Sequence, residues 1–236
     1  MKNIFLGLML FAISALSFSQ EVVGEEKKIS YRELNDSLSR VNIKLLKEGA
    51  LLVRLQTKNK SIEALREIGE NDKAAEIEKH QHDHNLSIIN AFKTNFTFCP
   101  TYFFYSHYSP YIIQKQFDKV VFLNENLIED STIRFDGEKF LTAEFAAIEQ
   151  DTAKYFSHYS FEDSEDQRLN KTENYYGSSD MGFEALIIKN DQFMQLKSPF
   201  PYYVRTFNSL PVRKSNNKTV KKMNDKLFHF LKEKQK

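Results

Sequence analysis

The most restrictive feature of this sequence is a pair of apolar, strand-like segments separated by a long helical region. Residues 50–56 (ALLVRLQ) and 101–106 (TYFFYS) are rich in branched and aromatic side chains, which favours β-strands. Between them, residues 61–68 and 71–93 have the periodicity of helices. Two strands of one sheet joined by a helical crossover are parallel and form a right-handed unit. The sequence therefore predicts an α/β fold.

A further helix is predicted before the first strand. Ser30 and Glu33 have the spacing of a capping box, and Gly49 is suited to end the helix. Four apolar residues recur between these limits at helical spacing and predict its buried face: Leu34, Leu38, Val41 and Leu45.

The second half of the chain has shorter strand patterns. Residues 119–124 (KVVFLN) are a third strand candidate. Asp136-Gly137 is a strong hairpin signal between residues 132–135 and 139–147. A second hairpin is predicted from residues 183–189 through Asn190-Asp191 to residues 193–196.

The C-terminal region begins with another strand candidate at residues 202–207. Residues 208–219 are polar and loop-like, and Val220, Met223, Leu227 and Leu231 then mark an amphipathic helix. Residues 150–182 are acidic and polar and predict a long loop. Together the patterns predict a single α/β domain over residues 30–236, with a mixed sheet of about five to seven strands and flanking helices. A thioredoxin-like arrangement is the alternative.

The N-terminus has the three-part pattern of a secretory signal. A basic residue, Lys2, precedes an apolar run from Ile4 to Leu16, and small residues follow at Ser17 and Ser19. We expect residues 1–19 to be a signal peptide, residues 20–29 to be a flexible leader, and the mature protein to be periplasmic or extracellular. No later segment has the length and apolarity of a transmembrane helix.

Charge and cysteine usage exclude two classes. With 33 basic and 32 acidic residues, the net charge is +1, which lacks the basic character of a nucleic-acid-binding protein. Cys99 is the only cysteine, so no disulfide can form within the chain, and the fold must depend on its apolar core.

A histidine cluster is the first candidate for chemistry. His80 and His84 are four residues apart on one helix face, beside Glu76, His82 and Asp83. Such a pair can bind zinc or copper, but no HExxH pattern or third ligand is evident. We therefore expect a partly buried His84, solvated His80 and His82, and no metal or other cofactor.

Cys99 is the second candidate. The segment 96–101 (FTFCPT) has some likeness to the cysteine region of peroxiredoxins, but that family's upstream proline and threonine are not in register here. A reactive cysteine of that type opens a helix, whereas Cys99 is expected between a helix and a strand. We expect a buried packing residue.

Three weaker patterns complete the candidates. Residues 177–182 (GSSDMG) have the glycine spacing of a phosphate loop, but neither the Lys-Ser/Thr pair nor a following helix is present. The tetrapeptide SHYS occurs at 106–109 and 157–160, with no nucleophile elbow near it. A deep pocket on which His158, Asp180 and nearby carboxylates converge would be the most informative observation for an enzymatic function.

Four stretches over residues 49–207 resemble uncharacterised exported proteins of Bacteroidetes: GALLVRLQTK, NFTFCPTYFFYS, FAAIEQDTAKYF and YYGSSDMGFEALIIK. This resemblance implies export and a single domain, and it implies no activity. Two classes of function remain open, with catalytic residues and partner unknown. The first is a non-catalytic binding or envelope-maintenance protein, and the second is a small periplasmic hydrolase or redox-related enzyme with a site formed by residues 150–182.

Overall fold

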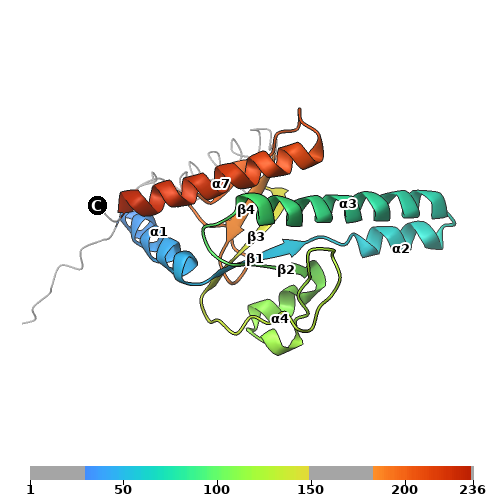
Figure 1. Cartoon of the computed structure of the whole chain (residues 1–236), viewed down its shortest axis with the longest axis horizontal. Coiled ribbons are helices and arrows are strands. Elements are labelled where there is room, and N and C mark those ends of the chain that lie inside the picture. The colour runs from blue at the N-terminus through green and yellow to red at the C-terminus, as the bar shows by residue number, and fades with distance from the viewer. Residues whose placement is uncertain (1–29, 149–182, 235–236) are drawn as a thin grey trace, which may run out of the picture.

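The computed structural model describes residues 30–148 and 183–234, which alternate between helices and strands (Figure 1). The order begins α1 (Tyr31–Glu48), β1 (Ala50–Leu55), α2 (Asn59–Glu67), α3 (Asn71–Asn95) and β2 (Thr101–Tyr105). It continues through η1 (Ser106–Tyr108), α4 (Ser109–Ile113) and η2 (Phe117–Lys119) to β3 (Phe140–Ala147). The last elements are β4 (Glu184–Lys189), β5 (Tyr203–Arg205) and α7 (Val212–Lys234).

The strands form one five-stranded mixed sheet in the order β2-β1-β3-β4-β5. β1 is parallel to β2, with Val53 opposite Phe103, and parallel to β3, with Leu52 opposite Thr142. β4 is antiparallel to both β3 and β5. The predicted parallel crossover and the α/β class with a mixed sheet and flanking helices are confirmed. The thioredoxin-like alternative stays a prediction.

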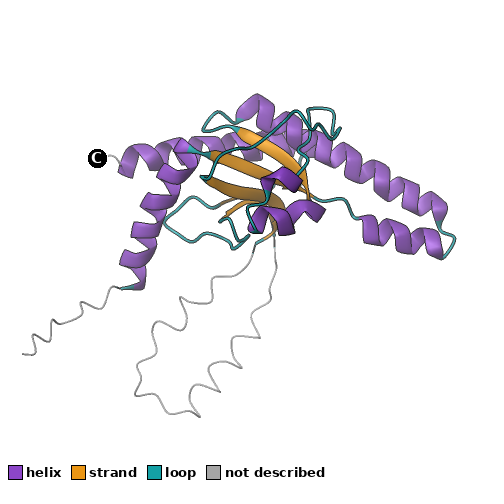
Figure 2. Cartoon of the chain, turned by 90° about the horizontal axis from the view of Figure 1, so that it is seen from below, coloured by secondary structure: helices purple, strands orange, loops and turns teal. Residues whose placement is uncertain are grey.

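Helices cover the two faces of the sheet unequally. The larger apolar cluster joins the sheet to α1, α3 and α7 through residues such as Ile43, Phe92 and Met223. A smaller, aromatic cluster around Phe104, Phe122 and Phe140 lies on the opposite face, where α4 and the segment before β3 pack (Figure 2). Within the described residues, no helix is long and apolar enough to cross a membrane.

Helix α1 starts as predicted but buries a different face. Ser30 accepts a hydrogen bond from the backbone of Glu33, and the Glu33 carboxylate accepts one from the backbone of Ser30, so the capping box is confirmed. The predicted apolar face is wrong. Three of its members are exposed and Leu45 is only partly buried; the exposed residues are Leu34, Leu38 and Val41.

Polar side chains of α1 take the buried positions because they have partners there. Ser39 is buried, donates to the Asn35 carbonyl oxygen, and accepts a hydrogen bond from the backbone N–H of Phe200. A buried hydroxyl with both bonds satisfied carries little desolvation cost. Ile43 and Leu46 supply the apolar contacts one and two turns further on.

The first predicted hairpin and the third predicted strand are both wrong. Residues 119–124 form no strand and join only isolated bridges, from Leu123 to Phe103 and to Glu129. Residues 132–135 are also irregular, and β3 pairs with β1 instead. The reason is tertiary: Phe135 is buried against the rings of Phe117 and Phe140, so it is committed to the core.

The second predicted hairpin is partly right. Strand β4 turns at Asn190, where the backbone N–H donates to the Met194 carbonyl oxygen, but the return segment makes only one bridge, Gln195 to Lys189. The predicted loop at residues 208–219 is wrong in its second half, because α7 begins at Val212. The first turns of α7 bury polar residues, including Asn216, which donates to Ser87 on α3.

Candidate functional site

A pocket of about 610 Å³ lies beyond the carboxyl ends of β1 and β3, between α3 and the start of α7. Open α/β sheets place ligands at this edge. We call it the His84 pocket. Its lining comes from residues after β1, from α3, from β3 and β4, and from the β5–α7 connection: Gln56, Lys58, His80, Gln81, His84, Phe145, Glu184, Thr206, Phe207, Asn208, Leu210, Val212, Ser215 and Asn216.

Helix α3 forms one wall with residues spaced three or four apart. Gln81 and His84 both line the pocket, and Asn85 is buried behind them. Gln81 donates through Nε2 to Asn85 Oδ1 at 3.0 Å, and Asn85 donates through Nδ2 to the Gln56 carbonyl oxygen at 2.8 Å. These bonds fix the helix against the end of β1, so this wall is preorganised.

His84 is the titratable group at the centre of this wall. Burial lowers its pKa below the ordinary value, Glu184 opposes the shift, and Lys58 adds to it. The side chain is half-buried and meets the edge of the Phe145 ring, with 6.3 Å between ring centroids. At neutral pH the imidazole is therefore uncharged, and it can both donate and accept a hydrogen bond.

The opposite wall comes from the β5–α7 connection. Thr206 Oγ1 lies 3.0 Å from the Glu184 carbonyl oxygen and 2.8 Å from Asn208 Oδ1, and its single proton can be donated to either oxygen. Ser215 Oγ accepts from the Phe207 backbone N–H at 2.9 Å. The wall therefore presents hydroxyl and amide groups beside an aromatic ring.

A buried ionic cluster lies on the face of the sheet that carries the smaller, aromatic cluster. Glu144 on β3 accepts from Arg54 NH1 at 2.8 Å and pairs with Lys189 Nζ at 2.9 Å, although its own side chain is only 5% exposed. Gln56 Nε2 lies 3.4 Å from the same carboxylate and connects the cluster to the pocket wall. Buried charges are retained only when they are paired.

The geometry of the ionic cluster is a product of sheet register. Arg54 and Glu144 follow directly on the paired residues Val53 and Ala143 of two parallel strands, so both project from the same face. Lys189 on β4 is opposite Thr142 on β3. Thr142 is two residues from Glu144, so Lys189 projects from the same face of the sheet as Glu144. The Arg54 guanidinium carbon lies 5.5 Å from the centroid of the Phe193 ring.

The three histidines of the predicted cluster differ in burial. His84 is partly buried, as expected, whereas His80 and His82 are exposed, and His80 pairs with Glu76 at 3.6 Å. His80 and His84 both line the pocket. Within residues 30–148 and 183–234, no three His, Cys, Asp or Glu side chains form a group that could hold a metal ion.

Cys99 is buried, as predicted. Burial raises the pKa of its thiol to about 12, even though the nearby Lys47 acts in the opposite direction. Lys47 is distant in sequence and reaches this region by donating to the Phe98 carbonyl oxygen at 2.8 Å. The cysteine lies outside the His84 pocket.

The predictions for the long polar loop fall outside the described residues. They concern residues 150–182, including His158, the second SHYS tetrapeptide, Asp180 and the glycine-spaced segment 177–182. The first tetrapeptide is described: it contains η1 and the first residue of α4, where Ser109 Oγ donates to the Ser106 carbonyl oxygen at 2.6 Å.

Sequence reasoning missed Gln56, Gln81 and Glu144. A usable signal existed for one of them: Glu144 interrupts the otherwise apolar run FLTAEFAA of β3, and a charge inside a buried strand requires a partner. Gln56 and Gln81 gave no such signal.

Comparisons with protein-family models, with curated proteins and with solved structures found no match for this chain.

Proposed function

We propose that this chain is an exported, non-catalytic binding protein, and that its ligand occupies the His84 pocket. One observation carries the proposal: the pocket combines neutral hydrogen-bonding groups with aromatic rings. Gln56, Gln81, Asn208 and Asn216 contribute amides, and Phe145 and Phe207 contribute rings. Binding sites for small molecules commonly have this mixture of apolar surface and a few placed polar groups.

The charges of the pocket favour a ligand without large net charge. Lys58 and Glu184 both line it and are of opposite sign, and the imidazole of His84 is neutral at pH 7. Amides and a neutral imidazole bind hydroxyl and carbonyl groups, while phenylalanine rings pack against apolar C–H surface. A small polyol or saccharide has both kinds of surface, so we propose this ligand class.

Export is supported by the Lys2–Ser19 pattern, and the resemblance to exported proteins of Bacteroidetes agrees with it. In the native host, we expect the mature protein in the periplasm or outside the cell, beginning near Gln20. N-terminal sequencing of the protein from the envelope fraction tests this. An intact Met1 on cytosolic protein would contradict it.

Ligand binding is tested by NMR titration of the mature protein with a panel of neutral mono- and disaccharides, following the backbone amide resonances of the residues that line the pocket. We expect at least one member to shift these resonances saturably. His84→Ala should abolish the response, whereas His82→Ala, an exposed residue of the same helix that does not line the pocket, should retain it. Saturable binding that survives His84→Ala unchanged would place the ligand elsewhere and refute the proposal.

A further inference from the structure

Strand β5 is an edge of the sheet in the part of the chain that the structure describes. The Ile188 N–H donates to the Tyr202 carbonyl oxygen, the Thr206 N–H donates to the Glu184 carbonyl oxygen, and Val204 is opposite Leu186. Alternate residues of a strand direct their backbone groups to opposite sides. The N–H and C=O groups of Tyr203 and Arg205 therefore point away from β4. Such an edge can pair with another chain.

A cleft of about 490 Å³ runs along this edge, between β5 and α7. Tyr203, Arg205 and Phe207 line one side, and Lys222 and Lys226 line the other. Lys218 continues the same row, because residues four apart share one face of a helix. The open strand edge and a row of lysines therefore face the same space.

The cationic side chains at this cleft lie over aromatic rings. Lys218 Nζ lies 4.3 Å from the centroid of the Phe207 ring, and Lys226 Nζ lies 5.6 Å from that of Tyr203. The Arg205 guanidinium carbon lies 3.9 Å from the centroid of Phe183. Among the described side chains, no carboxylate forms an ion pair with Arg205, Lys218, Lys222 or Lys226.

Within residues 30–148 and 183–234, the cleft therefore carries positive charge that no ion pair compensates. Burial lowers the pKa of Lys226. The like charge of Lys222 lowers it further, because the two ammonium groups repel each other. A carboxylate placed in the cleft relieves this repulsion. Lys226 Nζ donates to the Tyr203 carbonyl oxygen at 3.3 Å, which is a long hydrogen bond. A carbonyl oxygen has two lone pairs, so this oxygen can also accept from a backbone N–H of an added strand.

We propose that the open edge of β5 binds an acidic, extended peptide segment of a partner protein, which adds to the sheet as a further strand. Its backbone pairs with Tyr203 and Arg205, and its carboxylates face Lys222 and Lys226. Strand addition of this kind takes affinity from main-chain hydrogen bonds and specificity from side chains. A peptide fits better than a nucleic acid or polyphosphate because those polyanions would use the lysines and leave the strand edge unpaired.

The probe is a fluorescent, end-blocked peptide of alternating glutamate and threonine, titrated into the mature protein and followed by fluorescence anisotropy. Two control peptides separate charge from backbone: one replaces glutamate by lysine, and the other carries N-methyl groups on alternate amides. We expect only the unmodified acidic peptide to bind, with affinity that falls as salt is raised. Amide hydrogen exchange in the wild-type protein should slow at Tyr203 and Arg205 when this peptide is present.

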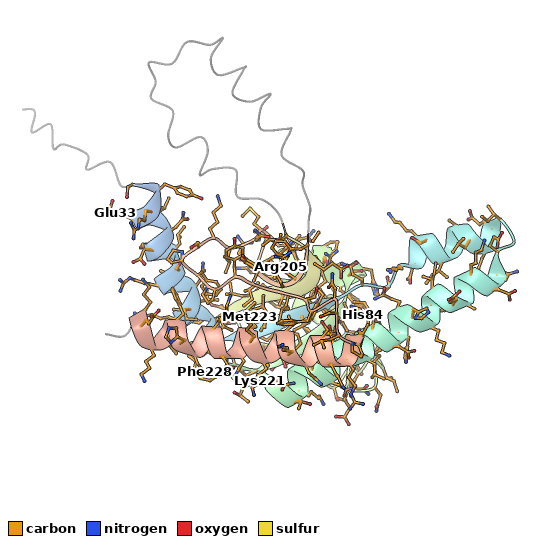
Figure 3. The ribbon with its side chains drawn as sticks, turned by 90° about the horizontal axis from the view of Figure 1, so that it is seen from above. Glu33, His84, Arg205, Lys221, Met223 and Phe228 are labelled. Carbon is orange, nitrogen blue, oxygen red and sulfur yellow. The ribbon has the colours of Figure 1, made fainter. Side chains whose placement is uncertain are left out.

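Charge-reversal variants locate the site. Lys222→Glu/Lys226→Glu should weaken binding by about tenfold or more. Lys79→Glu/Lys221→Glu changes the net charge equally at two exposed lysines outside the cleft lining, and should stay within about twofold of wild type. Figure 3 shows Lys221 and Arg205 on opposite sides of α7. His84→Ala should also bind the peptide normally, so this site and the proposed pocket can fail independently.

Four results would overturn the proposal. The first is peptide binding that is unchanged in Lys222→Glu/Lys226→Glu, with both double variants shown by circular dichroism to be folded. The second is equal binding of the N-methylated peptide, which would mean that charge alone is recognised. The third is binding of inorganic tripolyphosphate without binding of the acidic peptide. The exchange measurement needs no variant, and unprotected amides at Tyr203 and Arg205 under saturating peptide would also refute strand addition.

Discussion

Replacing Glu144 by glutamine should strongly destabilise the fold. The Glu144 side chain is 5% exposed and its ion-pair partner Arg54 is 26% exposed, with 2.8 Å between the paired atoms. Glutamine has nearly the same shape but removes the negative charge, so the Arg54 guanidinium remains largely buried without its carboxylate. Arg54 Nε is already buried without a hydrogen bond within the described residues, so it offers no compensation.

Breaking a buried ion pair by removing one partner costs about 3–5 kcal/mol, and we take about 3 kcal/mol because water reaches part of Arg54. The assay is urea unfolding of the mature protein, followed by circular dichroism. With a slope of about 2 kcal/mol per molar urea, the midpoint should fall by about 1.5 M. The matched control is Glu48→Gln. Glu48 pairs with Lys139, and both side chains are 58% exposed, so this control should leave the urea midpoint close to that of wild type.

A double-mutant cycle separates charge from packing. Arg54→Met in the Glu144→Gln background removes one of the two cations that lose the Glu144 carboxylate, the other being Lys189, and should recover about 1 kcal/mol or more of the lost stability. If Glu144→Gln unfolds within about 0.5 M urea of wild type, the cluster is solvated and the reasoning is wrong. If Arg54→Met destabilises Glu144→Gln further, packing of the long side chain, and not its unpaired charge, dominates.

Three other predictions concern the candidate residues. Because burial raises the pKa of the Cys99 thiol to about 12, a thiol reagent at pH 8 should label the native protein slowly and the urea-unfolded protein fast; fast native labelling would revive a redox role. Because the pKa of His84 is lowered from 6.5 in the folded state, the unfolded chain binds more protons below that pH, so stability should fall as pH drops below 6.5 and level off below the folded pKa. NMR titration of His84 should give a midpoint below 6.5, and a midpoint above it would contradict the burial argument. Zinc and EDTA should leave the melting temperatures of wild type and His80→Ala/His84→Ala unchanged, and a chelator-dependent drop in wild type would reveal a metal site.

The sequence by itself determined the elements whose signals are local. The capping box at Ser30 and Glu33 positions the start of α1, because both partners are three residues apart. The branched and aromatic run at Ala50–Leu55 and the long helical pattern after it were sufficient to predict two parallel strands and hence the α/β class. The burial of Cys99 followed from its aromatic neighbours in the chain.

Tertiary structure decided which faces are buried and which strands pair. α1 buries Asn35 and Ser39 and exposes Leu34, because the Ser39 hydroxyl accepts a hydrogen bond from the backbone N–H of Phe200, which is distant in the chain. No hairpin forms at Asp136-Gly137, and β3 pairs in parallel with β1 instead. Burial of Phe135 in the aromatic cluster stabilises the fold more than a two-stranded ribbon would.

The candidate sites depend almost entirely on long-range contacts. Only sheet register brings Arg54, Glu144 and Lys189 to one face, and only the packing of α7 against the sheet places Lys222 and Lys226 beside the open edge of β5. Local sequence determines periodicity and caps because these involve residues within one helical turn. The partners of a buried charge or a strand edge are far apart in the chain, so the free energy that selects them exists only in the assembled fold.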